Sequence, residues 1–239
     1  MCVILLYGCV SRENRYFNRA IRYEAAGEFE KAIRYLDKIL GINPLSIVAY
    51  WHRGHNRFDL SDYAGAMSDY RQMIAIDSTC VVGYLNVAAV YLRTGYYHSA
   101  IAYYNKALLK SGARLGEDYE ILSSFIFAHF TTNSLLAALS GRRYRPERIE
   151  QPVLSIAEIA FYRGIAFYFA DNLELALRDF RFSQANTTNF EWQLEISYWI
   201  GQVFLRTGQI DYACRYLRFP AMAGYSYAER DYEEFCRCR

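Results

Sequence analysis

Apolar and polar positions follow a helical period over most of the chain, most clearly around residues 82–109. Apolar residues there recur at spacings of three and four and so share one helix face: Tyr84, Val87, Ala88 and Tyr91. Gly95 follows as a residue that can adopt a positive φ and end a helix. The pattern therefore predicts a helix over residues 82–94, a tight turn, and a second helix over residues 97–109.

The same pattern repeats in the first half of the chain at a fixed step of 34 residues. Three alanines, two sets of aromatic residues and one set of small residues keep this step: Ala32/Ala66/Ala100, Tyr16/Tyr50/Tyr84, Phe29/Tyr63/Tyr97 and Ala20/Gly54/Ala88. A fixed period of this length indicates a repeat architecture of helix-turn-helix units. We expect the small positions to mark close approach of the two helices, because a large side chain there would force them apart.

The order of small and large residues resembles the tetratricopeptide repeat (TPR) family. The resemblance is carried by Ala20, Tyr23, Gly27, Ala32 and Pro44, and again by Ala88, Tyr91, Gly95 and Ala100. Looser units follow with Gly164, Phe167, Leu173, Ala176 and Phe180, then with Gly201, Phe204, Gly208, Ile210 and Ala213. The second repeat departs from the pattern, since Arg57 replaces an aromatic residue and Ser61 replaces the turn glycine. The resemblance implies an all-α fold, a right-handed superhelical solenoid of helix-turn-helix repeats.

The repeats divide the chain into five parts. We expect an apolar N-terminal segment, three well-defined repeats, a degenerate repeat with a basic loop, two further repeats and a C-terminal capping segment: residues 1–12, 13–114, 115–150, 151–220 and 221–239. The degenerate repeat has its turn at residues 131–133, and the loop covers residues 141–148. A capping helix is predicted over residues 228–236, because the last repeat of an array needs a polar outer face.

Residues 2–9 form a short apolar run that ends in Leu6-Tyr7-Gly8-Cys9. This ending resembles that of a bacterial lipoprotein signal peptide, with Cys9 as the lipidated residue, although the run is shorter than usual and lacks basic residues before it. Residues 11–14 are polar, as a tether before the first helix would be. The alternative is an apolar lead-in that packs on the first repeat.

Charge and motifs exclude several classes of function. The net charge is +2 and the isoelectric point about 8.1, too mild to indicate nucleic acid or an anionic membrane surface as a partner. The chain has no glycine-rich phosphate loop, nucleophile elbow or HExxH motif, so we expect no enzyme and no cofactor. His52 and His55 could share a helix face and a metal ion, but only Asp59 lies nearby, so we expect packing or binding roles and no metal site.

Six cysteines are present, and their spacing matches no zinc signature. Cys236 and Cys238 could chelate a metal or form a disulfide. We expect them to be an incidental pair in the C-terminal tail.

The first helix of each repeat lines the concave face of such an array. The residues expected to face this groove are aromatic or aliphatic: Phe17, Ile21, Trp51, His55, Phe58, Leu85, Leu92, Phe161, Tyr168 and Tyr198. Trp and Tyr anchor interfaces because they offer large rigid contact area. The alternative is that many of these rings fill space between neighbouring repeats. The basic residues of a carboxylate-clamp adaptor are missing from these positions.

We therefore expect an interaction scaffold that binds a partner peptide or helical segment in a concave aromatic groove. In this interpretation the protein is a membrane-anchored bacterial lipoprotein tethered through Cys9. The alternative is a cytoplasmic TPR regulator or secretion chaperone that sequesters an amphipathic segment. We expect no nucleic acid partner, and exposed ends of the array could also stack to form a homodimer.

Overall fold

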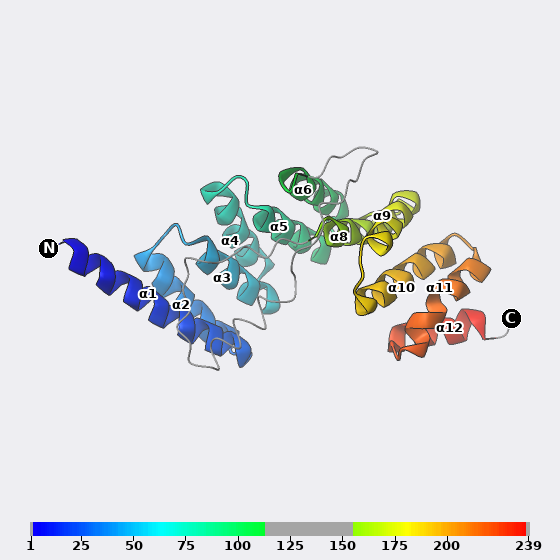
Figure 1. The fold of residues 1–239 in the computed structure, drawn as a ribbon, viewed down its shortest axis with the longest axis horizontal. Coiled ribbons are helices and arrows are strands. Elements are labelled where there is room, and N and C mark those ends of the chain that lie inside the picture. The colour runs from blue at the N-terminus through cyan, green and yellow to red at the C-terminus, as the bar shows by residue number, and fades with distance from the viewer. Residues whose placement is uncertain (1, 113–154, 238–239) are drawn as a thin grey trace. The chain divides into compact units, whose positions relative to one another are not determined.

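A computed structural model describes residues 2–112 and 155–237 of the chain, with side chains from residue 12 onward (Figure 1). Every regular element in these ranges is an α-helix, which confirms the all-α prediction. The chain divides into two compact units, and the described parts of these are residues 2–94 and residues 95–112 with 155–237. The boundary follows Thr94, inside the third predicted repeat. The degenerate repeat, its turn at 131–133 and the loop at 141–148 lie outside the described residues.

The described part of the first unit, residues 2–94, contains five consecutive helices. They are α1 (Cys2–Ala25), α2 (Phe29–Ile42), α3 (Ile47–Asp59), α4 (Tyr63–Ile76) and α5 (Val81–Arg93). Each helix packs against the next one, so α1/α2 and α3/α4 form helical hairpins and α5 packs on α4. One core cluster of this unit is formed by apolar residues of α1, α2 and α3: Phe17, Ala20, Ile21, Leu36, Ile39, Leu40 and Ala49.

The second unit continues the same plan. The helices in its described part are α6 (Tyr97–Lys110), α8 (Ile156–Phe169), α9 (Leu173–Ala185), α10 (Phe190–Arg206), α11 (Ile210–Met222) and α12 (Ser226–Cys236). Helices α8/α9 and α10/α11 form hairpins, α6 packs on α8, and α12 packs on α11. The predicted capping helix over residues 228–236 is thus confirmed, beginning two residues earlier.

Local sequence accounts for the helix ends. Gly27 and Gly95 have φ of 71° and 80°, the left-handed conformation that ends the first helix of a repeat. Ser61 keeps this conformation with φ of 63° although it lacks glycine's freedom. The left-handed conformation of a residue other than glycine costs about 1 kcal/mol or more in conformational free energy. The packing of the surrounding hairpin must therefore impose this turn. The predicted helices at 82–94 and 97–109 are confirmed to within one residue at each end.

The small positions mark close helix contacts, as the sequence predicts. A Cβ atom added at Gly54 would lie 2.5 Å from Cε1 of Tyr70, and one at Gly164 would lie 2.8 Å from Cε1 of Phe180. A Cβ atom added at Gly201 would likewise lie 2.8 Å from Cδ2 of Leu217. In each hairpin the large residue follows the small one by 16 positions, and these pairs therefore fix the distance between the two helices.

The N-terminal segment differs from one expectation. Helix α1 runs without interruption through residues 11–14, so these residues are not a tether before the first helix. Among the described residues, no helix is long and apolar enough to span a bilayer.

Candidate functional site

Three predicted contact residues form a row of rings on α3, which we call the α3 aromatic row: Trp51, His55 and Phe58. Trp51 stacks on His55 with ring centroids 5.7 Å apart and an interplanar angle of 19°. Phe58 packs edge-on against Tyr63 of α4 at 5.4 Å. The imidazole of His55 is 49% exposed, and Trp51 and Phe58 are half-buried. Part of the surface of these three rings is therefore exposed to solvent.

A polar cluster next to this row joins α3 to α1. Nδ1 of His52 lies 2.9 Å from Oε2 of Glu24, and the side-chain amide of Asn56 donates to Oε1 of Glu24 at 2.5 Å. The ring of Phe17 meets the imidazole of His52 edge-on at 5.0 Å. His52 is 3% exposed, so this cluster is part of the packing between the helices.

His52 and His55 therefore have different surroundings. The buried His52 faces Glu24 on α1. The exposed His55 stacks on Trp51, and its Nε2 lies 3.9 Å from Oδ2 of Asp59. No group of three or more metal-ligating side chains converges within the described residues. His52 therefore has a packing role, and a binding role for His55 remains a prediction.

Four of the predicted groove residues lie in the core. Phe17 and Ile21 are 5% exposed, Leu85 is 6% exposed and Phe161 is 3% exposed. So little surface cannot form a contact area, which corrects the expectation for these four residues; they belong to the packing between helices. The sequence could not separate them from exposed positions, because both sets are apolar at helical spacing. Leu92 is half-buried.

In the second unit, Tyr168 lies on α8 beside a basic residue of α10. The guanidinium of Arg206 lies 4.7 Å from the centroid of its ring and donates to its backbone carbonyl at 2.9 Å. Arg206 also pairs with Asp171 at 2.7 Å. Burial raises the pKa of the Tyr168 hydroxyl, and Arg206 opposes that shift. The ring of Tyr168 is half-buried and retains open surface.

Tyr198 on α10 is partly covered by the capping helix α12. Its ring meets that of Tyr227 at 4.5 Å, and its hydroxyl donates to Oδ2 of Asp231 at 3.3 Å. Burial raises the pKa of Tyr198, and the negative charge of Asp231 adds to the shift. The amide of Gln202 donates to the same carboxylate oxygen at 2.6 Å. Tyr198 is therefore engaged by the chain itself more than Tyr168 is.

Two ion pairs of buried aspartates at equivalent positions were not predicted from the sequence. The guanidinium of Arg163 binds Asp179 through two bonds of 2.6 and 2.8 Å, and that of Arg53 binds Asp69 through bonds of 3.0 and 2.6 Å. Both aspartates are 1% exposed. Arg57, the departure from the repeat pattern, also binds Asp69, at 2.8 Å. The sequence does contain a signal for these pairs. In each hairpin the arginine directly precedes the small residue, and the aspartate follows the arginine by 16 positions.

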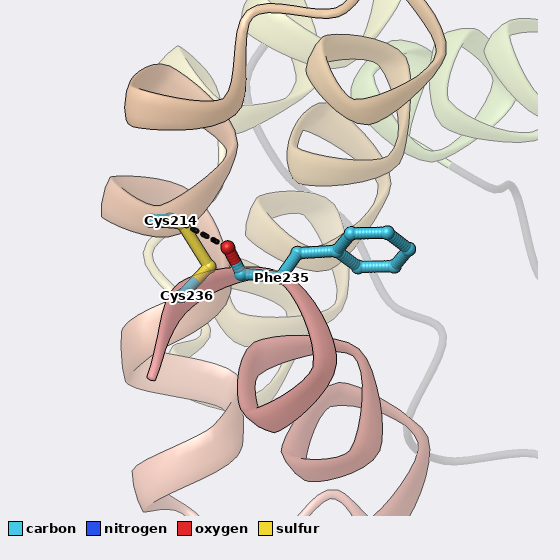
Figure 2. Close-up of a disulfide and its surroundings, with 3 residues drawn as sticks. All are labelled: Cys214, Phe235 and Cys236. Atoms are coloured by element: carbon cyan, nitrogen blue, oxygen red, sulfur yellow. Dashed lines mark hydrogen bonds between the residues drawn. A yellow bond between two sulfur atoms is a disulfide. The ribbon is translucent and has the colours of Figure 1, made fainter. Parts of the chain in front are cut away.

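A disulfide joins α11 to α12 through Cys214 and Cys236 (Figure 2). The expectation that Cys236 and Cys238 are an incidental pair is wrong for Cys236, and Cys238 lies outside the described residues. Spacing alone could not choose this pairing among six cysteines. Cys80 is buried, and this burial raises the pKa of its thiol.

Repeated helical hairpins, each held by a small residue packed on a large one, define a helical repeat protein. The family comparison matches the tetratricopeptide repeat model to residues 82–109. The TPR repeat-containing protein MJ1428 of Methanocaldococcus jannaschii is 28% identical over 93 residues, which are 39% of this chain and 16% of the relative. Residues 82–109 thus match a tetratricopeptide repeat, and the chain is similar to proteins built from such repeats; it spans about one sixth of the length of that relative.

Solved structures support the same fold. The Pseudomonas aeruginosa pilF protein aligns with a TM-score of 0.62 at 16% identity, over 91% of this chain and 78% of that one. YrrB, described as a TPR protein with an unusual peptide-binding site, aligns with a TM-score of 0.57 at 14% identity, over 91% and 90% of the two chains. At this identity the likeness establishes the fold alone. TPR proteins are in general interaction scaffolds rather than enzymes, and this fold is compatible with that role.

Proposed function

We propose that the protein is an interaction scaffold that binds an apolar or aromatic segment of a partner protein. The observation that carries the proposal is the α3 aromatic row, which presents ring surface from a rigid helix. Aromatic side chains anchor interfaces because they bury large areas and lose little rotamer entropy. Tyr168 with Arg206 offers a second anchor of similar chemistry in the other unit. The peptide-binding site attributed to YrrB is in keeping with this role for the fold.

The proposal is tested by affinity capture after crosslinking in cells, comparing the wild type with Trp51→Ala and with Tyr168→Ala. Leu109→Ala is the matched control, because Leu109 is 62% exposed on α6 and belongs to neither set. A captured partner is then reduced to short synthetic segments, whose affinity is measured by calorimetry. We expect Trp51→Ala to weaken binding by about 2 kcal/mol, roughly thirtyfold, as at interface hot spots. Equal binding by all three variants would place the interface elsewhere.

We further propose that the protein is exported and tethered to a bacterial membrane through a lipid on Cys9. Two features support this: Leu6-Tyr7-Gly8-Cys9 resembles the end of a lipoprotein signal, and Cys214 forms a disulfide with Cys236. Disulfides persist in oxidising compartments and are rare in the cytosol. The disulfide is therefore the observation that favours the exported form over a cytoplasmic regulator or secretion chaperone.

Cell fractionation with Cys9→Ser tests the tether. We expect the wild type in the membrane fraction and the variant released from it. Alkylation of thiols in intact cells, followed by non-reducing gel electrophoresis, tests the compartment through Cys214 and Cys236. Reduced cysteines together with a protein in the soluble fraction would support the cytoplasmic alternative instead.

A further inference from the structure

We propose that the outer face of α1 is a contact surface for the anionic phospholipid headgroups of a bilayer. Four arginines recur along this helix at spacings of three, four and three residues, and we call them the arginine stripe: Arg12, Arg15, Arg19 and Arg22. All four side chains are exposed. The buried face of the helix, formed by Phe17, Ala20 and Ile21, lies on the opposite side.

The carboxylates of α1 lie on the side of the helix away from the arginine stripe. The helix carries two, Glu13 and Glu24. Glu13 accepts a hydrogen bond from Asn43 at 3.4 Å, and Glu24 faces His52 and Asn56 of α3. Both are thus directed toward other helices. Four positive charges therefore share one face of α1, although the whole chain has a net charge of only +2.

Aromatic rings and a lysine border the stripe. The guanidinium of Arg19 donates to the hydroxyl of Tyr35 at 3.2 Å, and Nζ of Lys38 lies 4.6 Å from the centroid of the same ring. Tyr16 adds a ring 6.1 Å from Tyr35. The side chains of α1 also line a surface hollow of about 400 Å³. Its described lining residues are Arg12, Arg15, Tyr16, Asn18, Arg19 and Arg22. Guanidinium groups bind phosphate oxygens bidentately, and tyrosine rings favour the membrane–water interface.

The position of the stripe favours a bilayer over other anionic partners. Residues 2–9 are apolar, and α1 continues from them directly into the arginines. At 1.5 Å per residue, Arg12 follows Cys9 by about 4.5 Å along the axis, and the stripe extends about 15 Å further. An apolar run of about 12 Å can enter one leaflet but cannot cross a hydrocarbon core of about 30 Å. A bilayer takes up an apolar anchor and the adjacent cations together, whereas a nucleic acid or an acidic protein uses only the cations.

The inference does not depend on acylation. A lipid on Cys9 and the uncleaved apolar segment both place the first arginine within one turn of the anchor. One acyl chain alone gives only marginal membrane binding, and a neighbouring basic patch supplies the second signal. The stripe would thus convert weak attachment into stable attachment on an anionic leaflet.

The test uses the full chain with Cys9→Ser, so that no lipid contributes. Flotation measures its binding to vesicles of phosphatidylcholine, and to vesicles of phosphatidylcholine and phosphatidylglycerol in equal parts. The variants are Arg12→Gln/Arg15→Gln/Arg22→Gln and the same three positions changed to Lys, with circular dichroism as the folding check. The matched control is Arg178→Gln/Arg181→Gln/Arg218→Gln, which removes the same charge from exposed positions of α9 and α11.

We expect binding to the anionic vesicles alone, weakening as salt rises. Each arginine near an anionic surface contributes about fivefold in affinity, so the triple Gln variant should bind on the order of 100-fold more weakly. The control and the Lys variant should stay within a few-fold of the parent. Equal binding to both vesicle types, equal loss in the control, or release of the protein from vesicles by a short DNA duplex at equal phosphate concentration would each overturn the proposal.

Discussion

Gly54→Ala should destabilise the protein, although alanine is the better helix former. Gly54 lies inside α3, where replacing glycine by alanine ordinarily gains about 1 kcal/mol of helix stability. Here the added Cβ would lie 2.5 Å from Cε1 and 2.9 Å from Cδ1 of Tyr70. The ring of Tyr70 is 2% exposed and fixed on α4, so it cannot move aside freely.

The magnitude follows from these two opposing terms. Overpacking in a core typically costs about 1–3 kcal/mol, and a contact well below 3.0 Å to a rigid ring places this site in the upper part of that range. After the gain in helix propensity, we expect a net loss of about 1–2 kcal/mol in the free energy of unfolding. For a chain of this size that corresponds to a fall of roughly 2–8 °C in melting temperature.

Circular dichroism during urea and thermal denaturation measures the change. Gly41→Ala is the matched control, because Gly41 is also helical but has nothing within 4 Å of an added Cβ; it should be neutral or stabilising. The double variant Gly54→Ala/Tyr70→Leu should recover most of the loss, because the first hairpin packs Ala20 with Leu36 in the same register. A Gly54→Ala variant as stable as Gly41→Ala would refute the reasoning.

Three further predictions concern the second unit and high pH. Arg163→Ala should cost about 3 kcal/mol in the free energy of unfolding, because the buried carboxylate of Asp179 loses its two-bond partner and keeps only the exposed Arg178 at 3.6 Å. Arg178→Ala, at a side chain that is 59% exposed, should stay within about 0.5 kcal/mol in the same urea titration. Replacing both Cys214 and Cys236 by Ser should lower stability by about 2–4 kcal/mol, and a reductant should shift the unfolding midpoint of the wild type but not of the variant. Burial raises the pKa of Tyr70, so its stabilising contribution is present below the ordinary tyrosine pKa of about 10 and is lost as pH rises above it. Tyr70→Phe should therefore flatten the alkaline fall in urea midpoint, and an unchanged slope would count against this assignment.

The sequence predicted the helices and their turns because both depend on local signals. Gly27 and Gly95 end first helices, and the small residues at Gly54 and Gly164 mark close approach. The turn at Ser61 was also predicted, although the residue itself does not favour it. These features recur with the period of the repeat, so each occurrence supports the others.

The candidate site was predicted only in part. Trp51 and Phe17 both lie at apolar helical positions, yet one presents surface and the other is buried. Burial depends on which neighbouring helix covers a residue. Helix α12 partly covers Tyr198, and nothing in the sequence of α10 indicates this contact. The disulfide likewise depends on how two helices are placed, which spacing between cysteines does not contain.

The 16-residue pairing of small and large residues also bears on how the chain folds. Contacts such as Gly54 with Tyr70 close short loops, so each hairpin can form without bringing distant parts of the chain together, and such topologies fold quickly. One described contact is different, because Arg163 on α8 donates to Asn105 on α6 at 2.8 Å across 58 residues. Closing that long loop is entropically less favourable than closing a hairpin. We therefore expect the docking of α6 onto α8 to be the late step in folding, with the individual hairpins protected from amide hydrogen exchange before it.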